Sequence, residues 1–152
     1  MTNETFYYIL GNILNMKKES LKTKVSFLKD YSSVNTTMSN FDLSFYLDKI
    51  KLKQRWIQGE PNSMILLKHP NKQIVLIAMH EGMEMESFQL NDSVTLQIIE
   101  GKLKFQTRKE TITLEKDQIL TFRDTIKYSM TTDIETVFLL TISNRMLQYS
   151  VN

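Results

Sequence analysis

Short apolar runs separated by turn residues fill the chain after Trp56. They recur at the roughly 8–12-residue spacing that is typical of all-β sandwiches and barrels. The runs predict strands at 64–68, 73–79, 83–90, 94–100, 102–107, 111–114, 118–122, 126–131 and 136–142. No helical pattern interrupts them, so the sequence predicts a sandwich or barrel for this part of the chain.

The alternation of apolar and polar positions is clearest in residues 102–107. Leu103 and Phe105 alternate there with two lysines and a glutamine. Successive side chains of a strand point to opposite faces, so one face of this strand is expected to be buried and the other solvated. That pattern is typical of an antiparallel sheet.

The first 50 residues carry helical periodicity instead. Apolar residues between Phe6 and Leu14 recur at helical spacing, and the polar stretch 31–39 predicts a loop. A second helix is expected to begin at Asn40 or Ser39 as its N-cap. The apolar face of that helix would consist of Leu43, Tyr46, Leu47 and Ile50.

Composition narrows the class of protein. A chain of 152 residues with 41% hydrophobic content is sufficient for one domain with one core. The formal charge of +2 is too small to indicate nucleic-acid binding. There is no cysteine, which excludes a disulfide framework and a thiolate metal site and fits a cytoplasmic location. The apolar stretch 6–14 is shorter than the about 20 residues of a membrane span, so we expect no membrane partner.

Met16 is an alternative start, and we expect residues 1–15 to precede the functional product.

Two glycines frame a stretch with a recognisable spacing, GMEMESFQLNDSVTLQIIEG, from Gly82 to Gly101. It resembles the first metal-binding motif of the cupin superfamily: glycine, five residues, His-x-His, three or four residues, Glu, six residues, glycine. A second cupin motif follows at the expected distance. Its first glycine would fall on Asp117, its second glycine on Thr125 and its histidine on Tyr128.

The resemblance covers residues 56–142 and is to single-domain, RmlC-like members of the superfamily. It implies a mainly β fold, a cupin-type antiparallel jelly-roll barrel. The N-terminal helical segments, which the periodicity predicts, lie outside the resemblance. Residues 1–50 would form a helical extension within the same domain, and residues 51–152 the cupin-like barrel. A homodimer is a common assembly of this fold and is expected here.

The resemblance also shows what this chain lacks. The metal-ligand positions of the two motifs fall on Phe88, Leu90, Val94 and Tyr128. Only Tyr128 has an oxygen, and a phenol with a pKa of about 10 is a poor sole ligand for a divalent ion. An apolar lining disfavours a charged ion. We therefore predict a degenerate, metal-free cupin with no cofactor.

The remaining histidines and acidic residues are interpreted as structural. His69 lies in a predicted turn, and His80 ends a strand, where it would pair with Glu81 or with a backbone group. Glu84 and Glu86 share one face of a strand, and we expect that face to be solvated. The alternative is a non-standard metal site built from His80, Glu84 and Glu86.

These observations support three hypotheses. The first is a small-molecule binding or sensor protein whose barrel takes a small apolar organic ligand. Its predicted lining consists of Phe88, Leu90, Gln97, Phe122, Tyr128 and Met130. Gln97 would serve only if its side chain points inward; a hydrogen-bonded core amide is the alternative. The second is a metal-independent isomerase or epimerase that uses His80 and Tyr128 as its base and acid. The third is a dimeric interaction module.

Overall fold

The computed structural model describes residues 38–69, 71–87, 92–123 and 125–143. These residues form two helices, α2 (Leu43–Lys51) and α3 (Gln54–Ile57). They also form the strands β1 (Asn62–His69), β2 (Lys72–Met79), β3 (Glu84–Glu86), β4 (Ser93–Glu100), β5 (Lys102–Thr107), β6 (Thr111–Glu115), β7 (Ile119–Arg123), β8 (Tyr128–Thr132) and β9 (Thr136–Ser143). The helix predicted between Phe6 and Leu14 lies outside the described residues.

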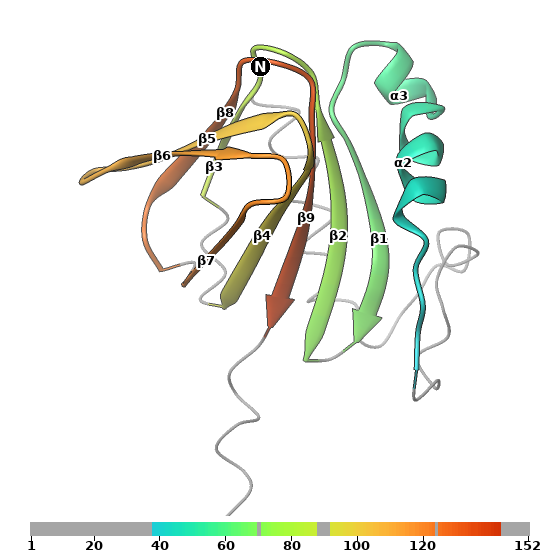
Figure 1. Ribbon diagram of the computed structural model, residues 1–152, viewed down its shortest axis with the longest axis horizontal. Helices are drawn as coiled ribbons and strands as arrows, with labels where there is room; N and C mark the ends of the chain where they lie inside the picture. The colour runs from blue at the N-terminus through green and yellow to red at the C-terminus, as the bar shows by residue number, and fades with distance from the viewer. Residues whose placement is uncertain (1–37, 70, 88–91, 124, 144–152) are drawn as a thin grey trace, which may run out of the picture.

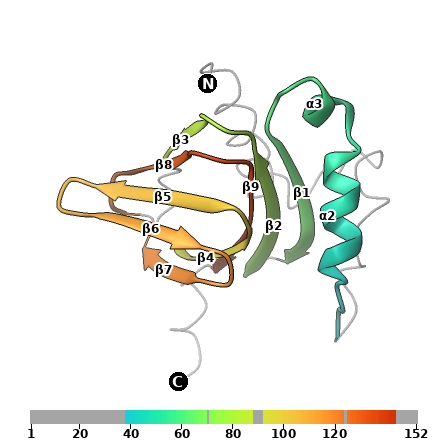
Figure 2. The same ribbon diagram turned by 45° about the horizontal axis from the view of Figure 1, so that its top comes forward.

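The strands form two antiparallel sheets that face each other (Figure 1). The five-stranded sheet has the order β1-β2-β9-β4-β7, and the four-stranded sheet has the order β3-β8-β5-β6. Strands adjacent in the sequence are repeatedly placed in different sheets, as in a jelly roll. Figure 2 shows the β5–β6 hairpin extending away from β1 and β2, with β8 next to β5. The predicted fold class, a mainly β jelly-roll barrel preceded by helical segments, is confirmed.

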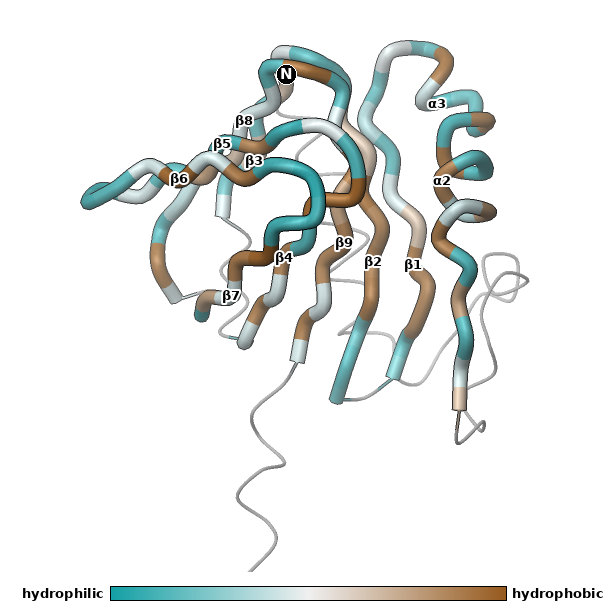
Figure 3. Tube along the Cα trace, in the orientation of Figure 1, coloured by the Kyte–Doolittle hydropathy of each residue, from teal (hydrophilic) through white to brown (hydrophobic). Residues whose placement is uncertain are grey.

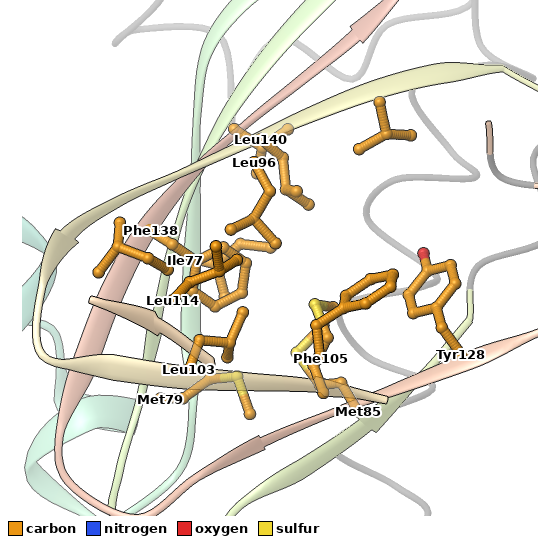
Figure 4. Close-up of a cluster of buried hydrophobic side chains, with 14 of the residues drawn as sticks. Ile77, Met79, Met85, Leu96, Leu103, Phe105, Leu114, Tyr128, Phe138 and Leu140 are labelled. Atoms are coloured by element: carbon orange, nitrogen blue, oxygen red, sulfur yellow. The ribbon is translucent and has the colours of Figure 1, made fainter. Parts of the chain in front are cut away.

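The space between the sheets is filled by one apolar cluster (Figure 4). Val94, Leu96 and Ile98 of β4 are each fully buried in it, while the residues between them are only partly buried. Leu103 and Phe105 of β5 enter the same cluster, as the alternation in that strand predicts. Burial of these side chains is the main stabilising contribution to the barrel.

A second apolar cluster lies on the outer face of the five-stranded sheet, where α2 and α3 cover β1 and β2 (Figure 1). Ile50 is fully buried there and Trp56 is 7% exposed. The predicted apolar face of the helix packs into this cluster: Leu43, Tyr46, Leu47 and Ile50. Figure 3 shows polar residues at both ends of β1 and at the beginning of β2, with hydrophobic positions along the rest of β2.

The predicted N-cap of this helix is wrong. Asp42 has extended backbone angles, and its carboxylate accepts a hydrogen bond of 3.0 Å from the backbone N–H of Ser44. Asp42 therefore satisfies a free N–H group of the first turn, and the helix begins at Leu43 instead of directly after Ser39 or Asn40.

One lysine joins the helical layer to the barrel. Lys51, at the end of α2, forms ion pairs of 2.9 Å with Glu100 and 2.8 Å with Glu135. Partial burial lowers the pKa of Lys51, but hydrogen bonds to Glu135 and Glu100 and the negative charges of both carboxylates outweigh it. The pKa of Lys51 is consequently raised above its ordinary value of 10.5. Glu100 ends β4 and Glu135 precedes β9, so the lysine holds α2 against one end of the larger sheet.

The two motif glycines are needed for their backbone conformation. Gly82 has φ +76° and Gly101 has φ +87°, a region that side chains disfavour. Asp117, at the position of the second motif's first glycine, also has a positive φ of 69°. Aspartate tolerates this conformation better than most residues, which explains how the turn persists without glycine.

Candidate functional site

Three aromatic rings meet inside one end of the barrel. The ring of Phe105 stacks on that of Tyr128, with centroids 4.8 Å apart and an interplanar angle of 21°. Phe122 contacts both rings, at 4.9 Å from Phe105 and 4.9 Å from Tyr128. We call Phe105, Phe122 and Tyr128 the aromatic cluster. Such ring pairs stabilise a fold by about 0.5–1.5 kcal/mol beyond the contribution of the buried apolar area.

Strand register brings the three rings together from both sheets. Phe122 of β7 lies opposite Val94 of β4 in the five-stranded sheet. Tyr128 of β8 lies opposite Thr107, two residues beyond Phe105 in β5 of the four-stranded sheet. Side chains two residues apart share a face, so both strands present their rings to the interior.

Burial differs among the rings. Phe105 is 2% exposed and Tyr128 is 5% exposed, whereas Phe122 is only partly buried on β7, an edge strand. Figure 4 shows Tyr128 beside Phe105 at one edge of the apolar cluster, with the only oxygen among the side chains drawn. A phenol group can both donate and accept a hydrogen bond, so it is the polar feature of an otherwise apolar region.

The structure brings together part of the predicted lining. Phe122 and Tyr128 are in contact, and Met130 is fully buried in the same interior, opposite Phe105 in the neighbouring strand. The other two aromatic and aliphatic candidates, Phe88 and Leu90, lie outside the described residues.

Gln97 is not part of this lining. It lies opposite Ile119, which is 60% exposed, and opposite Leu139, which packs on the helix side of the sheet. Cross-strand partners share a face, so Gln97 points away from the interior that Leu96 and Ile98 enter. The prediction that Gln97 orients a ligand inside the barrel is therefore wrong.

Phe105 was missed as a site residue, although the sequence contained a signal for it. The alternation of residues 102–107 places Phe105 and Leu103 on the buried face. What the local pattern could not give is the distance from Phe105 to Tyr128, because β5 and β8 are separated by two other strands in sequence.

His80 has a structural role at the other end of the barrel. Its Nε2–H donates a hydrogen bond of 3.0 Å to the carbonyl oxygen of Trp56, and its ring stacks on the indole. Thr132 donates a hydrogen bond of 2.7 Å to the carbonyl oxygen of His80. This agrees with the structural interpretation of His80, although the backbone partner is Trp56.

The base–acid pair required by the isomerase hypothesis is not assembled. His80 lies at the Thr132 end of β8, and Tyr128 begins that strand. Four residues of a strand span about 13 Å at about 3.3 Å per residue. One small substrate cannot be within hydrogen-bond distance of both groups at that separation.

The described residues do not suit a metal ion either. Two of the metal-ligand positions of the cupin motifs are described, Val94 and Tyr128. Together they offer one phenol oxygen, whereas the cupin motif implies nitrogen and carboxylate ligands. Glu84 and Glu86 are exposed on the outer face of β3, which agrees with their interpretation as solvated residues. Among the described residues no group of three or more histidine, aspartate or glutamate side chains could hold a metal. His69 is exposed at the end of β1.

Solved structures with similar folds were compared with this geometry. A cupin superfamily protein from Desulfitobacterium hafniense aligns with a TM-score of 0.52 and 16% identity over 55% of this chain and 77% of its own. The chain has the cupin fold. The cupin domain of Schizosaccharomyces pombe Cnp3 aligns with a TM-score of 0.53 and 17% identity over 58% of this chain and 63% of its own.

Another solved structure has a similar fold over a larger share of this chain. A conserved protein of unknown function from Streptococcus pyogenes aligns with a TM-score of 0.57 and 15% identity over 75% of this chain and 94% of its own. At these identities the likeness shows the fold alone. No protein-family model and no curated protein matches the sequence. Among the helices that the structure describes, none is long and apolar enough to cross a membrane.

Proposed function

We propose that this cupin binds a small, largely apolar organic molecule inside its barrel and does so without a metal ion. The observation that carries the proposal is the aromatic cluster, three rings in mutual contact with one phenol hydroxyl among them. Ligand sites are typically apolar and aromatic, with few polar groups that fix the orientation of the ligand. Tyr128 supplies such a group beside Phe105 and Phe122.

Entry of a ligand requires one of the three rings to move. Phe122 is the least buried of them and belongs to the edge strand β7, so its displacement breaks fewer contacts than displacement of Phe105. In this account Phe122 swings aside and the ligand ring replaces it against Phe105 and Tyr128. Met130 forms the deeper wall below them.

A thermal-shift screen of the full chain tests the proposal, with neutral apolar compounds in one set and divalent metal salts in the other. A true ligand at a hundredfold excess over its Kd stabilises the folded state by about 2.7 kcal/mol. The expected result is a shift with at least one organic compound and none with the metals. That shift should be lost in Phe122→Asp and kept in Phe45→Asp, the control, because Phe45 is 57% exposed on α2.

Two results would count against binding in the barrel. A reproducible shift with a transition metal would mean that the donor set has been assigned incorrectly. An organic compound that stabilises Phe122→Asp as strongly as the unaltered chain would bind elsewhere on the molecule.

A second candidate, a dimeric interaction module, is favoured by one observation. Three large apolar side chains are exposed on the helical layer: Phe45 at 57%, Leu52 at 75% and Ile57 at 72%. Such side chains on neighbouring elements are typical of interaction surfaces. Sedimentation equilibrium of the full chain, compared with Leu52→Glu, tests this candidate. A monomer at all concentrations would eliminate it.

A further inference from the structure

The helical layer has an exposed apolar surface of its own. Phe45 is 57% exposed, Leu52 75% and Ile57 72%, and we call these three side chains the outer apolar patch. Phe45 lies in α2, Leu52 is the C-cap of that helix, and Ile57 ends α3. In Figure 1 and Figure 2 no described helix or strand lies beyond α2 on the side away from β1. The patch is therefore uncovered within the described part of the chain.

The helix α2 has apolar residues on two opposite faces. Successive helical residues are rotated by about 100°, so Phe45 and Leu52, seven positions apart, point in directions only about 20° apart. Leu52 keeps helical backbone angles, with φ −84° and ψ −11°, so the rotation extends to it. Leu47 and Ile50 lie roughly opposite and pack in the cluster on the sheet. Apolar residues all round are typical of a buried helix, so we expect a further element to cover the patch.

The sequence contains a segment with a matching apolar face. Residues 6–14 lie outside the described part of the chain, and their apolar positions follow the helical pattern i, i+3, i+4, i+7, i+8: Phe6, Ile9, Leu10, Ile13 and Leu14. At about 1.5 Å per residue this face would be about 12 Å long, close to the about 10 Å between Phe45 and Leu52. A helix this short is marginal in water unless it packs on an apolar surface.

The tether between this segment and α2 favours the segment over a second copy of the chain. Residues 15–37 link it to Met38, which is 84% exposed and precedes the N-cap Asp42. Even a random-coil linker of this length would span about 26 Å on average. That exceeds the about 13 Å length of α2, so the whole patch is within reach. A tethered segment has an effective concentration of about 1 mM, well above that of a free copy at about 10 µM.

We infer that residues 6–14 form a helix that packs on the outer apolar patch as an additional helix of the helical layer. The inference concerns a different part of the molecule from the proposed ligand site and does not depend on it. The apolar face of the segment contacts Phe45, Leu52 and Ile57, while Tyr8 and Asn12 lie on its solvated face. The same patch is the reason for the dimeric candidate, so the segment and a second copy compete for it.

Disulfide trapping in the full chain tests this inference, because the chain has no cysteine of its own. Leu52→Cys is combined with a second cysteine at each position from 6 to 14 in turn. A disulfide requires Cα atoms within about 4.4–6.8 Å, so intramolecular disulfides should form at least about tenfold faster from the apolar face than from Tyr8 and Asn12. Thr113→Cys is the control anchor. Thr113 is exposed on β6 in the other sheet, and no preference for one face is expected there.

Thiol protection provides a second measurement in the full chain. The thiol introduced by Leu52→Cys alone should react slowly with iodoacetamide while the segment covers it. Ile9→Asp combined with Ile13→Asp places charges on the apolar face and should raise that rate by at least about fivefold, because burying the carboxylates is costly and the segment detaches. Tyr8→Asp combined with Asn12→Asp is the matched control. It adds the same charges to the solvated face and should leave the rate unchanged.

Three outcomes would overturn the inference. Equal cross-linking rates along residues 6–14 would mean that the segment does not pack on the patch as a helix. Disulfide-linked dimers of Leu52→Cys as the main product would mean that a second copy occupies the patch. An alkylation rate that is the same in both charge variants would mean that the segment leaves Leu52 uncovered. None of these results bears on the ligand site inside the barrel.

Discussion

His80 lies flat against Trp56, with the ring centroids 3.5 Å apart and an interplanar angle of 15°. The Nε2 atom of His80 also lies 3.0 Å from the carbonyl oxygen of Trp56. Trp56 belongs to α3 and His80 follows β2, so this contact ties the helical layer to the larger sheet. His80, which the sequence interpretation treated as structural, is thus part of the fold.

Replacing His80 with alanine should remove both the stack and the hydrogen bond. We expect the free energy of unfolding to fall by about 1–2 kcal/mol. Urea denaturation followed by fluorescence measures this, because Trp56 is the single tryptophan of the chain. His69→Ala is the control and should change stability by less than about 0.5 kcal/mol, since His69 is exposed. Equal stabilities of the two variants would show that the His80 contact contributes nothing.

Gly101→Ala should be among the most damaging single substitutions in the barrel. A Cβ at this position would clash with the backbone oxygen of Glu135 and lie 2.6 Å from Oγ1 and 2.7 Å from Cα of Thr136. The backbone φ of +87° adds strain to the clash. The expected loss is about 4 kcal/mol or more, measured by thermal or urea denaturation.

Gly82→Ala separates the clash from the backbone strain. Gly82 has a φ of +76°, but a Cβ there would meet nothing within 4 Å. Its expected cost is only about 1–2 kcal/mol. If the two alanine variants were equally stable, the close approach of Glu135 and Thr136 to Gly101 would not exist in solution.

Lys51 should make stability depend on pH in the alkaline range. Its pKa is higher in the folded state than its ordinary value of 10.5, so its ion pairs stabilise the fold below that pH. This contribution is lost as the pH rises through the folded-state pKa. Lys51→Met should therefore cost about 0.5–1 kcal/mol at pH 7, and the difference from the unaltered chain should vanish above the raised pKa.

Lys102→Met provides the comparison for Lys51. Lys102 is 3.5 Å from Glu115, and both side chains are more exposed than Lys51. Its removal should have a smaller effect at pH 7. Urea denaturation from pH 7 to pH 12 follows both variants, and a Lys51→Met difference that grows with pH would show the sign to be wrong.

Apolar alternation predicted the strands of the barrel well. In 94–100 and 102–107 every second residue is apolar, and these positions are the ones that enter the interior. Burial of one face fixes the register of such strands, so a local pattern carries tertiary information. The spacing of the motif glycines also predicted two turns between strands. Gly82 and Gly101 both have a positive φ in these turns.

Gln97 shows where the interpretation departed from that pattern. Its neighbours Leu96 and Ile98 are apolar, and the interpretation left open that Gln97 points inward as well. Alternation requires the opposite, since residues next to an inward-facing one point outward. The N-cap was misjudged for a different reason, because Asp42, Asn40 and Ser39 all have suitable side chains and only the backbone geometry distinguishes them.

The aromatic cluster and the helical layer could be predicted only in part. Phe105, Phe122 and Tyr128 come from three strands in two sheets, and their contact depends on how the sheets face each other. The packing of Trp56 on His80 likewise joins residues 24 positions apart. Long-range packing of this kind has no local signal, so the sequence could indicate apolar faces but not their partners.

The most direct test of the central claim is NMR titration of the full chain with benzyl alcohol, observing the aromatic side-chain resonances. The account predicts shifts for Phe105, Phe122 and Tyr128 and none for Trp56, which lies in the separate cluster beneath the helices. A parallel titration with a zinc salt should leave the aromatic cluster unchanged. Shifts at Trp56 without shifts at the cluster, or zinc-induced shifts at Tyr128, would contradict a metal-free apolar site inside the barrel.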